Sequence, residues 1–172
     1  MYTNLHASVN KLDVSLATSK DTEQIIQLLK QVAGWLKEIG LNQWNYVIDG
    51  NADESIKQSI NKRETFIVRE RGKIVATFIL LEEQGEWDKQ LWGERNDESA
   101  YLHKFAVARS GMGKNMGGKI IEWILNYLKH TDKTHLRLDC IAENTTLNIY
   151  YVNQGLQKVG CQNGFSLYEK MV

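Results

Sequence analysis

Four glycines lie within eight residues in the middle of the chain: Gly111, Gly113, Gly117 and Gly118. The run 101–107 before them is apolar and aromatic, which predicts a strand. From residue 116 onward, isoleucines and leucines recur at the spacing of one buried helix face. The first N–H groups of a helix have no intrahelical partner and attract anions, and glycine lets a ligand approach the backbone closely. This strand, turn and helix therefore predict a site for a pyrophosphate.

Two nucleotide-binding motifs can be compared with this turn. Residues 113–119 fit the phosphate-loop pattern G-x-x-x-x-G-K, but Ile120 follows where the motif needs a serine or threonine for magnesium. The glycine spacing over residues 111–117 is one residue wider than the dinucleotide fingerprint, for which Asp139 would be the acidic partner. Only 33 of the 172 residues follow Asp139, too few for the rest of a doubly wound sheet. Both motifs are therefore poor explanations of the turn.

The composition excludes several classes of protein. Lysine plus arginine and aspartate plus glutamate both total 21, so the net charge gives no sign of a nucleic-acid or anionic-membrane partner. No apolar run approaches the roughly 20 residues of a membrane span, and no apolar segment follows a basic N-terminus. Cys140 and Cys161 are expected to be reduced, and no histidine or cysteine spacing predicts a metal site. We expect one soluble, cytoplasmic domain over residues 1–172.

The predicted elements run in the order strand, helical region, three strands, helix, strand, helix and two strands. The predicted strands are 13–18, 65–69, 73–81, 101–107, 136–139, 157–161 and 165–171. A first helix follows the caps Ser19 and Asp21 and is interrupted at Gly34, and further helices are predicted at 51–62, 116–128 and 144–153. The charged segment 82–99 is expected to be an exposed excursion between strands. Hairpins at both ends and a strand–helix–strand unit between them predict an α/β domain with one mixed sheet covered by helices.

The turn and its flanks resemble the acetyl-CoA site of the GNAT superfamily of N-acyltransferases. The family pattern is a strand ending in valine, four further residues, then Q/R-x-x-G-x-G/A with a helix behind it. Here Val107 ends the strand, Met112 replaces the glutamine or arginine, and Asn115 replaces the middle glycine. The diphosphate is held mainly by backbone N–H groups in this family, and asparagine tolerates unusual φ values. The resemblance implies coenzyme A contacts from Phe105, Ala106, Val107, Met112, Gly113, Lys114, Asn115, Met116, Gly117 and Gly118.

Residues 136–160 resemble the second motif of the family, so that the two motifs cover about a third of the chain, from residue 101 to about residue 160. Asn144 and Asn148 match positions beside the pantetheine and coenzyme A, and Asn144 also suits a helix cap. Tyr151, four residues before Gly155, matches the tyrosine that often serves as general acid. The family fold has a mixed, mostly antiparallel sheet whose central strands splay around the cofactor.

The resemblance implies an N-acetyltransferase that moves an acetyl group from acetyl-CoA to a primary amine by direct attack. Backbone N–H groups at the end of the 101–107 strand would polarise the carbonyl, and Tyr151 would protonate the departing thiolate. The candidates for the general base are Glu98 first, then His103 and Asp139.

The sequence does not identify the acceptor. Aromatic and acidic residues upstream favour a small cationic molecule, because rings and carboxylates both attract ammonium groups; these residues are Trp35, Trp44, Glu82 and Glu83. A peptide amine is the other option. The sequence does not determine the oligomeric state; dimers are common in the family, which makes a homodimer one option. The alternative is an acyl-CoA-binding module of the same fold that has lost transfer activity, which the departures at Met112 and Asn115 leave open.

Overall fold

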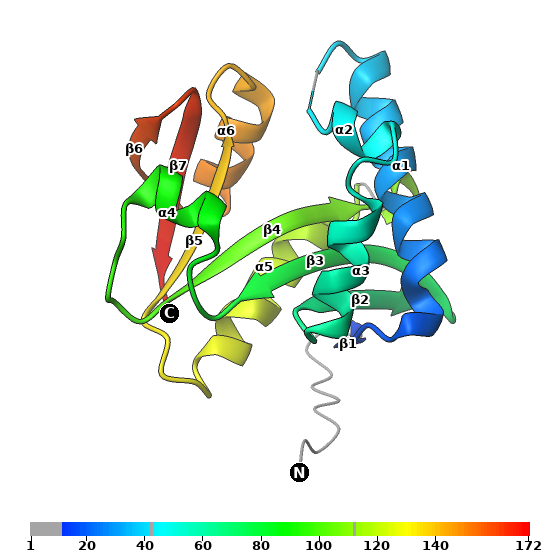
Figure 1. Ribbon diagram of the computed structural model, residues 1–172, viewed down its shortest axis with the longest axis horizontal. Helices are drawn as coiled ribbons and strands as arrows, with labels where there is room; N and C mark the ends of the chain where they lie inside the picture. The colour runs from blue at the N-terminus through cyan, green and yellow to red at the C-terminus, as the bar shows by residue number, and fades with distance from the viewer. Residues whose placement is uncertain (1–11, 42, 112) are drawn as a thin grey trace. The chain divides into compact units, whose positions relative to one another are not determined.

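The computed structural model describes residues 12–41, 43–111 and 113–172. Within these residues the strands form one mixed sheet in the order β1-β2-β3-β4-β5-β7-β6 (Figure 1). The strands are β1 (Asp13–Leu16), β2 (Thr65–Glu70), β3 (Lys73–Leu81), β4 (Ser99–Val107), β5 (His135–Ile141), β6 (Gln157–Gln162) and β7 (Phe165–Met171). Strand β4 pairs with β5 in parallel, whereas β1 with β2, β2 with β3, β5 with β7 and β6 with β7 are antiparallel. The prediction of a mixed, mostly antiparallel sheet flanked by helices is confirmed.

Helices occupy the connections between these strands. They are α1 (Thr22–Glu38), α2 (Asn45–Ile48), α3 (Asp53–Asn61), α4 (Glu86–Trp92), α5 (Met116–Leu128) and α6 (Thr145–Asn153), with 3-10 turns η1 (Ser19–Asp21) and η2 (Arg109–Gly111). In the described part of the chain, no helix reaches the length and apolarity that crossing a membrane requires. The hairpin between β2 and β3 turns through Arg71 and Gly72, whose φ values of 51° and 79° are those of a tight type I′ connection.

Two sequence predictions about these connections are wrong. Helix α1 does not stop at Gly34 but continues to Glu38. One glycine costs a helix only about 1 kcal/mol, and burial of the neighbouring Val32 and Ala33 outweighs that cost. The segment 82–99 is not simply an exposed excursion, because it contains α4, whose Leu91 and Trp92 are buried. Helix α4 was missed because it is too short, and the segment too rich in charged residues, to show a clear apolar periodicity.

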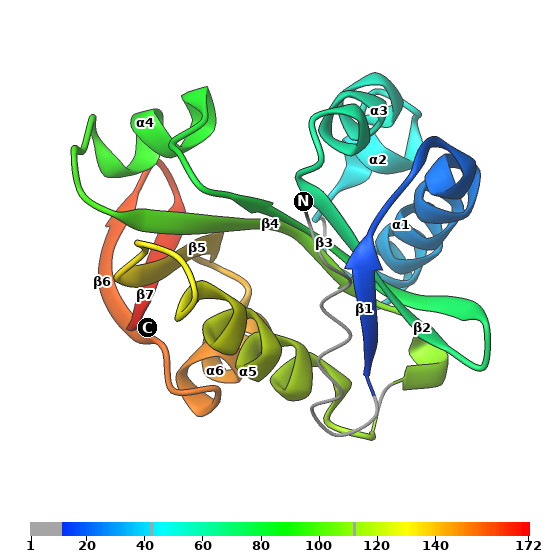
Figure 2. The same ribbon diagram turned by 90° about the horizontal axis from the view of Figure 1, so that it is seen from below.

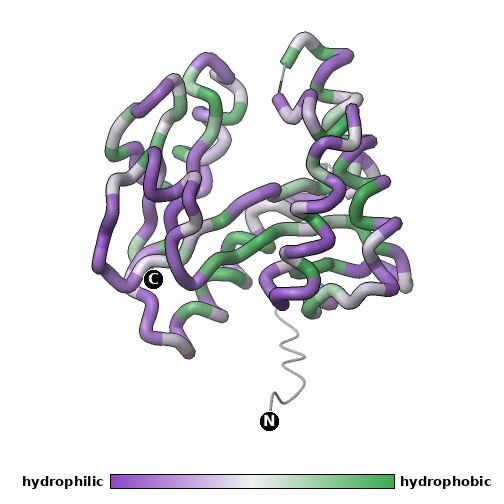
Figure 3. Tube along the Cα trace, in the orientation of Figure 1, coloured by the Kyte–Doolittle hydropathy of each residue, from purple (hydrophilic) through white to green (hydrophobic). Residues whose placement is uncertain are grey.

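The chain packs as two compact units. The first contains the chain up to Ile79 together with Lys104–Ile120, and the second contains Leu80–His103 and Ile121–Val172. A single domain over residues 1–172 stays a prediction. In the first unit, α1, α2 and α3 lie on one face of β1 to β3 (Figure 2) and bury a core that includes Ile25, Ile56 and Ile67. Strand β3 is hydrophobic along most of its length (Figure 3), as expected for a strand covered by other elements.

In the second unit, α4 lies across β5 and β7 (Figure 1). Its Leu91 and Trp92 pack with Tyr101 of β4 and Leu167 of β7. The parallel ladder between β4 and β5 consists of three registered pairs, which end at Tyr101 opposite Arg137. Strand β5 itself continues to Ile141.

Candidate active site

The glycine turn belongs to the first unit and lies between a strand and a helix, as predicted. Strand β4 ends at Val107, η2 follows, and α5 begins at Met116. Gly113 has a φ of 82° and Asn115 a φ of 52°, so both adopt the left-handed conformation. Gly113, Lys114 and Asn115 are exposed to solvent. Met112, the first predicted contact of the turn, lies outside the described residues.

Asn115 therefore occupies the position of the family's middle glycine in a conformation that glycine would favour. Left-handed backbone costs most L-residues about 1–2 kcal/mol, and the cost is lower for asparagine because its short side chain can form local hydrogen bonds.

We expect Asn115→Ala to lower the free energy of unfolding by about 1 kcal/mol, and Asn115→Gly to change it by less than about 0.5 kcal/mol. Urea denaturation measures both. Lys114→Ala is the control, because the Lys114 side chain makes only an exposed ion pair of 3.8 Å with Glu70. Equal stability of the alanine and glycine variants would contradict this account of the turn.

Strand β4 is irregular immediately before the predicted cofactor residues Phe105, Ala106 and Val107. Lys104 has a φ of 45°, which is rare for a lysine within a strand and redirects the peptide groups that follow, as a bulge does. Ala106 is buried, and Phe105 packs edge-on against Phe78 with ring centroids 6.5 Å apart. Such a break suits a strand that must present backbone N–H groups to a ligand.

In the second unit, the two predicted asparagines are used by the fold itself. The Asn144 side chain caps α6 by accepting from the N–H of Leu147 at 3.0 Å. The Asn148 amide nitrogen donates to the carbonyl oxygens of Asn144 at 2.8 Å and of Ile141 at 3.1 Å, and its oxygen accepts from the Tyr168 hydroxyl at 2.7 Å. The capping role expected for Asn144 is therefore present. Contact of either residue with coenzyme A, and of Met116, Gly117 and Gly118 at the start of α5, stays a prediction.

Tyr151 lies on α6 and is buried against the rings of Tyr150 and Tyr168, with centroid distances of 5.3 Å and 5.8 Å. Burial raises the pKa of its phenol well above the ordinary value, and the nearby Cys140 raises it further. The hydroxyl is therefore protonated at neutral pH. A general acid must meet this condition before it can donate a proton.

The three candidate bases lie in two different places within the second unit. Glu98 precedes β4, and its carboxylate forms a 3.0 Å ion pair with Lys133. His103 lies on β4 and Asp139 on β5, each four residues beyond the registered pair of Ser99 and His135. At a rise of about 3.3 Å per residue, that places them roughly 13 Å along the strands from the Glu98 end.

Helix α4 adds two residues that the sequence did not single out. The Nε2 atom of His103 lies 2.9 Å from Oδ1 of Asp88, whose carboxylate is 1% exposed, and Trp87 Nε1 donates to Asp139 Oδ1 at 3.1 Å. Burial raises the pKa of the Asp139 carboxyl, and the neighbouring Asp88 also raises it, whereas His103 and the hydrogen bond from Trp87 act in the opposite direction. The structure thus combines two of the three candidate bases in one cluster. No signal in the sequence relates residue 88 to residues 103 and 139.

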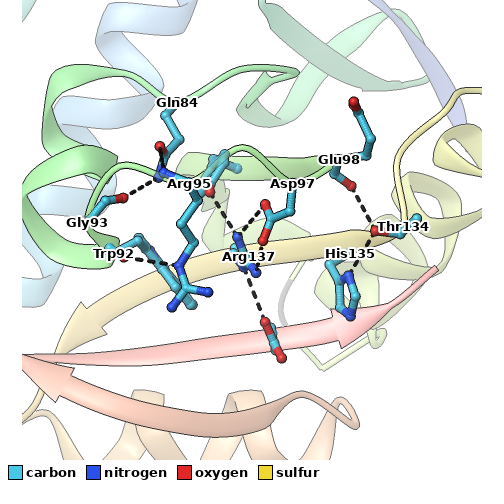
Figure 4. Close-up of polar contacts among 11 residues, drawn as sticks. Gln84, Trp92, Gly93, Arg95, Asp97, Glu98, Thr134, His135 and Arg137 are labelled. Carbon is cyan, nitrogen blue, oxygen red and sulfur yellow. Dashed lines mark hydrogen bonds and ion pairs between the residues drawn. The ribbon is translucent and has the colours of Figure 1, made fainter.

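Two residues before Asp139 on β5, the buried Arg137 holds the adjacent part of this unit together (Figure 4). The Arg137 guanidinium donates twice to Asp97, at 2.9 Å and 2.8 Å, and also to Glu169 at 3.2 Å and to the Tyr101 hydroxyl at 3.1 Å. It also lies 5.0 Å from the ring centre of Trp92. These contacts join β4, β5 and β7 to the connection that follows α4, and so fix the row of side chains next to His103 and Asp139.

The chain is similar over most of its length to known acetyltransferases. It is 34% identical over 158 residues to the uncharacterized N-acetyltransferase YesJ of Bacillus subtilis strain 168, covering 91% of this chain and 88% of that protein. A GNAT-family acetyltransferase from Listeria monocytogenes has a crystal structure with a TM-score of 0.83 and 32% identity, with 94% and 95% of the two chains covered. The PaiA N-acetyltransferase of Thermoplasma acidophilum, solved in complex with coenzyme A, shares the fold with a TM-score of 0.75 at 12% identity over 94% and 99% of the chains.

No protein-family model matches the sequence. The Bacillus and Listeria proteins nevertheless exceed 30% identity over more than nine-tenths of this chain. The chain belongs to the GNAT family of acetyltransferases.

Proposed function

We propose that this protein transfers an acetyl group from acetyl-CoA to a primary amine of a small acceptor by direct attack. The observation that carries the proposal is the exposed glycine turn at the start of α5, where Asn115 adopts a left-handed conformation that glycine would favour. Helix N-termini with such turns bind phosphates through backbone N–H groups. The crystal structure of the Thermoplasma PaiA enzyme with coenzyme A shows that the shared fold can hold this cofactor.

The reaction needs a proton acceptor for the amine and a proton donor for the thiolate. The amine nitrogen bonds to the thioester carbon, the carbon–sulfur bond breaks, and the phenol of Tyr151 protonates the sulfur. We assign the amine proton to His103, because the Asp88 carboxylate lies 2.9 Å from its Nε2 and would stabilise the positive charge of the imidazolium that forms. Glu98 stays a prediction, and its ion pair with Lys133 favours a structural role.

The aromatic residues expected to bind a cationic acceptor have other partners in the structure. The guanidinium of Arg109 lies 5.3 Å from the ring centre of Trp35, and Trp44 packs against the core of the first unit. Glu82 and Glu83 are exposed, so their carboxylates are still available to attract a cationic acceptor. A small cationic amine remains our proposal for the acceptor, and a homodimer remains our proposal for the assembly, which light scattering would check.

The test is release of free coenzyme A from acetyl-CoA in the presence of cationic, neutral and anionic amines. We expect at least one primary amine to accelerate release, with cationic amines the best acceptors. A protein that binds coenzyme A while no amine ever accelerates release would instead be the silent acyl-CoA-binding module. Failure to bind any coenzyme A derivative would remove both proposals.

His103→Gln is expected to lower kcat/KM at pH 7 by about tenfold, somewhat less than general bases usually contribute, because water can accept part of the proton flux. The loss should shrink as the pH rises, since more of the amine then arrives already neutral. The pH profile of kcat/KM measures this effect, and Glu98→Gln is the matched control. If Glu98→Gln shows the pH-dependent loss and His103→Gln does not, the base is Glu98.

A further inference from the structure

Three side chains of the second unit place ligand atoms within 4.8 Å of one another: Asp88 on α4, His103 on β4 and Asp139 on β5. Asp88 is 1% exposed, and the other two residues are partly buried. Each residue comes from a different element, so the cluster is formed by packing and not by a local turn. Imidazole nitrogen and carboxylate oxygen are the ligands with which proteins bind zinc and related divalent ions.

The geometry of the histidine–aspartate pair differs from that of an ordinary hydrogen bond. His103 Nε2 and Asp88 Oδ1 are 2.9 Å apart, yet both atoms are buried and neither has a hydrogen-bond partner among the described residues. The two atoms are therefore close without being aligned for donation. Two ligand atoms that each lie about 2.1 Å from one ion and subtend roughly a right angle are about 3 Å apart, which matches this spacing.

The charge balance of the cluster also favours a cation. The cluster would carry two negative charges with both carboxylates ionised and the imidazole neutral, and Asp88 is almost completely removed from water. Burying a charge is costly unless an opposite charge compensates for it. A divalent ion supplies that compensation, whereas a protonated His103 supplies only half of it.

Hydrogen bonds from outside the cluster hold both carboxylates in place. The N–H of Gly85 donates to Asp88 Oδ2 at 3.0 Å, which leaves Oδ1 facing His103. Trp87 Nε1 donates to Asp139 Oδ1, and the Trp87 ring packs edge-on against Phe165 with centroids 4.9 Å apart. Ligating carboxylates in metal proteins are commonly oriented by such outer hydrogen bonds.

We propose that Asp88, His103 and Asp139 form a binding site for one divalent transition-metal ion of the zinc type. The ion would take one nitrogen and two carboxylate oxygens from the chain, with water completing an octahedral coordination in which neighbouring ligands subtend about a right angle. Binding does not depend on the proposed function, but one consequence does. An ion on Nε2 of His103 leaves the ring proton on Nδ1, so metal binding should inhibit acetyl transfer if His103 is the base.

The test is calorimetric titration of the full-length, chelator-treated protein with Zn²⁺, together with the visible absorption of the Co²⁺ form, in the absence of acetyl-CoA and amine. We expect one ion per chain, with a Co²⁺ spectrum typical of nitrogen and oxygen ligands. His103→Gln and Asp139→Asn should each weaken binding on the order of a hundredfold. Trp87→Phe should weaken it about tenfold through the lost outer hydrogen bond, and because Trp87 is 42% exposed this variant should stay folded.

The double variant Cys161→Ser with His135→Gln is the control, because it removes other metal-binding side chains and should leave the affinity unchanged. The proposal would be overturned if no zinc binds at a 100-fold molar excess, which is roughly millimolar and far above the dissociation constant of a preformed site. Binding that survives His103→Gln would overturn it as well. In either case, Asp88 and His103 would form only a buried ion pair. A protein that binds zinc but whose metal-free form transfers no acetyl group to any of the amines would support the site and refute the proposed function. Transfer that zinc does not inhibit would show that His103 is not the base.

Discussion

Tyr151→Phe is expected to lower kcat for acetyl transfer about a hundredfold while changing the free energy of unfolding by less than about 1 kcal/mol. The variant removes only the hydroxyl, and the aromatic contacts with Tyr150 and Tyr168 remain available to a phenylalanine. Because burial holds the pKa of this phenol above its ordinary value, the wild-type enzyme should not lose activity through tyrosine ionisation below about pH 10. Steady-state kinetics of the wild type and of Tyr151→Phe from pH 6 to pH 10, at saturating acetyl-CoA, measure the effect.

Tyr150→Phe is the matched control for this prediction. Tyr150 is the neighbouring residue on α6, and its pKa is likewise raised by burial, but it has no proposed role in the reaction. Its variant should retain nearly full activity. If Tyr151→Phe retains at least half of the wild-type kcat, Tyr151 is a packed aromatic residue and the acid lies elsewhere. Equal losses in both variants would indicate a general disturbance of α6.

Arg137→Met is expected to lower the free energy of unfolding by about 3 kcal/mol, the low end of the range for removing one partner of a buried ion pair. The guanidinium is 4% exposed, whereas the side chains of its partners Asp97 and Glu169 are 40% and 27% exposed and can recover some hydration. Arg137→Lys should recover little, because an ammonium group cannot donate two parallel bonds to Asp97. Urea denaturation at pH 7 measures both variants.

The control is Lys89→Met, which breaks an exposed ion pair with Glu86 on the same helix α4 and should change stability by less than about 0.5 kcal/mol. The pH dependence gives a second check. The hydrogen bonds from Arg137 lower the pKa of the Asp97 carboxyl in the folded protein. The contribution of Asp97 to the free energy of unfolding is therefore complete above the unfolded pKa of about 3.9 and is lost as the pH falls through the lower, folded value. The stability difference between wild type and Asp97→Asn should be constant from pH 5 to pH 8 and shrink below about pH 4; a difference that grows in acid would contradict the assigned pair.

Local patterns in the sequence were sufficient for most of the fold. The start of α5 at Met116, the end of β4 at Val107 and the hairpin at Arg71 and Gly72 were all predicted, because glycine placement and apolar spacing act within a few residues. The left-handed turn at Asn115 follows from the same local chemistry. Position in the α6 motif also identified Tyr151, although its burial against Tyr168 depends on the neighbouring strand.

The contacts of the candidate base were decided only by tertiary structure. The sequence favoured Glu98 because it precedes a central strand, but the fold pairs it with Lys133. His103 and Asp139 are 36 residues apart in the sequence. Their side chains lie close together only because β4 and β5 pair in parallel with Ser99 opposite His135. A helix concealed among charged residues then places Asp88 against them. Strand register and helix docking depend on the packing of the whole unit, so no periodicity within one segment can specify which side chains meet there.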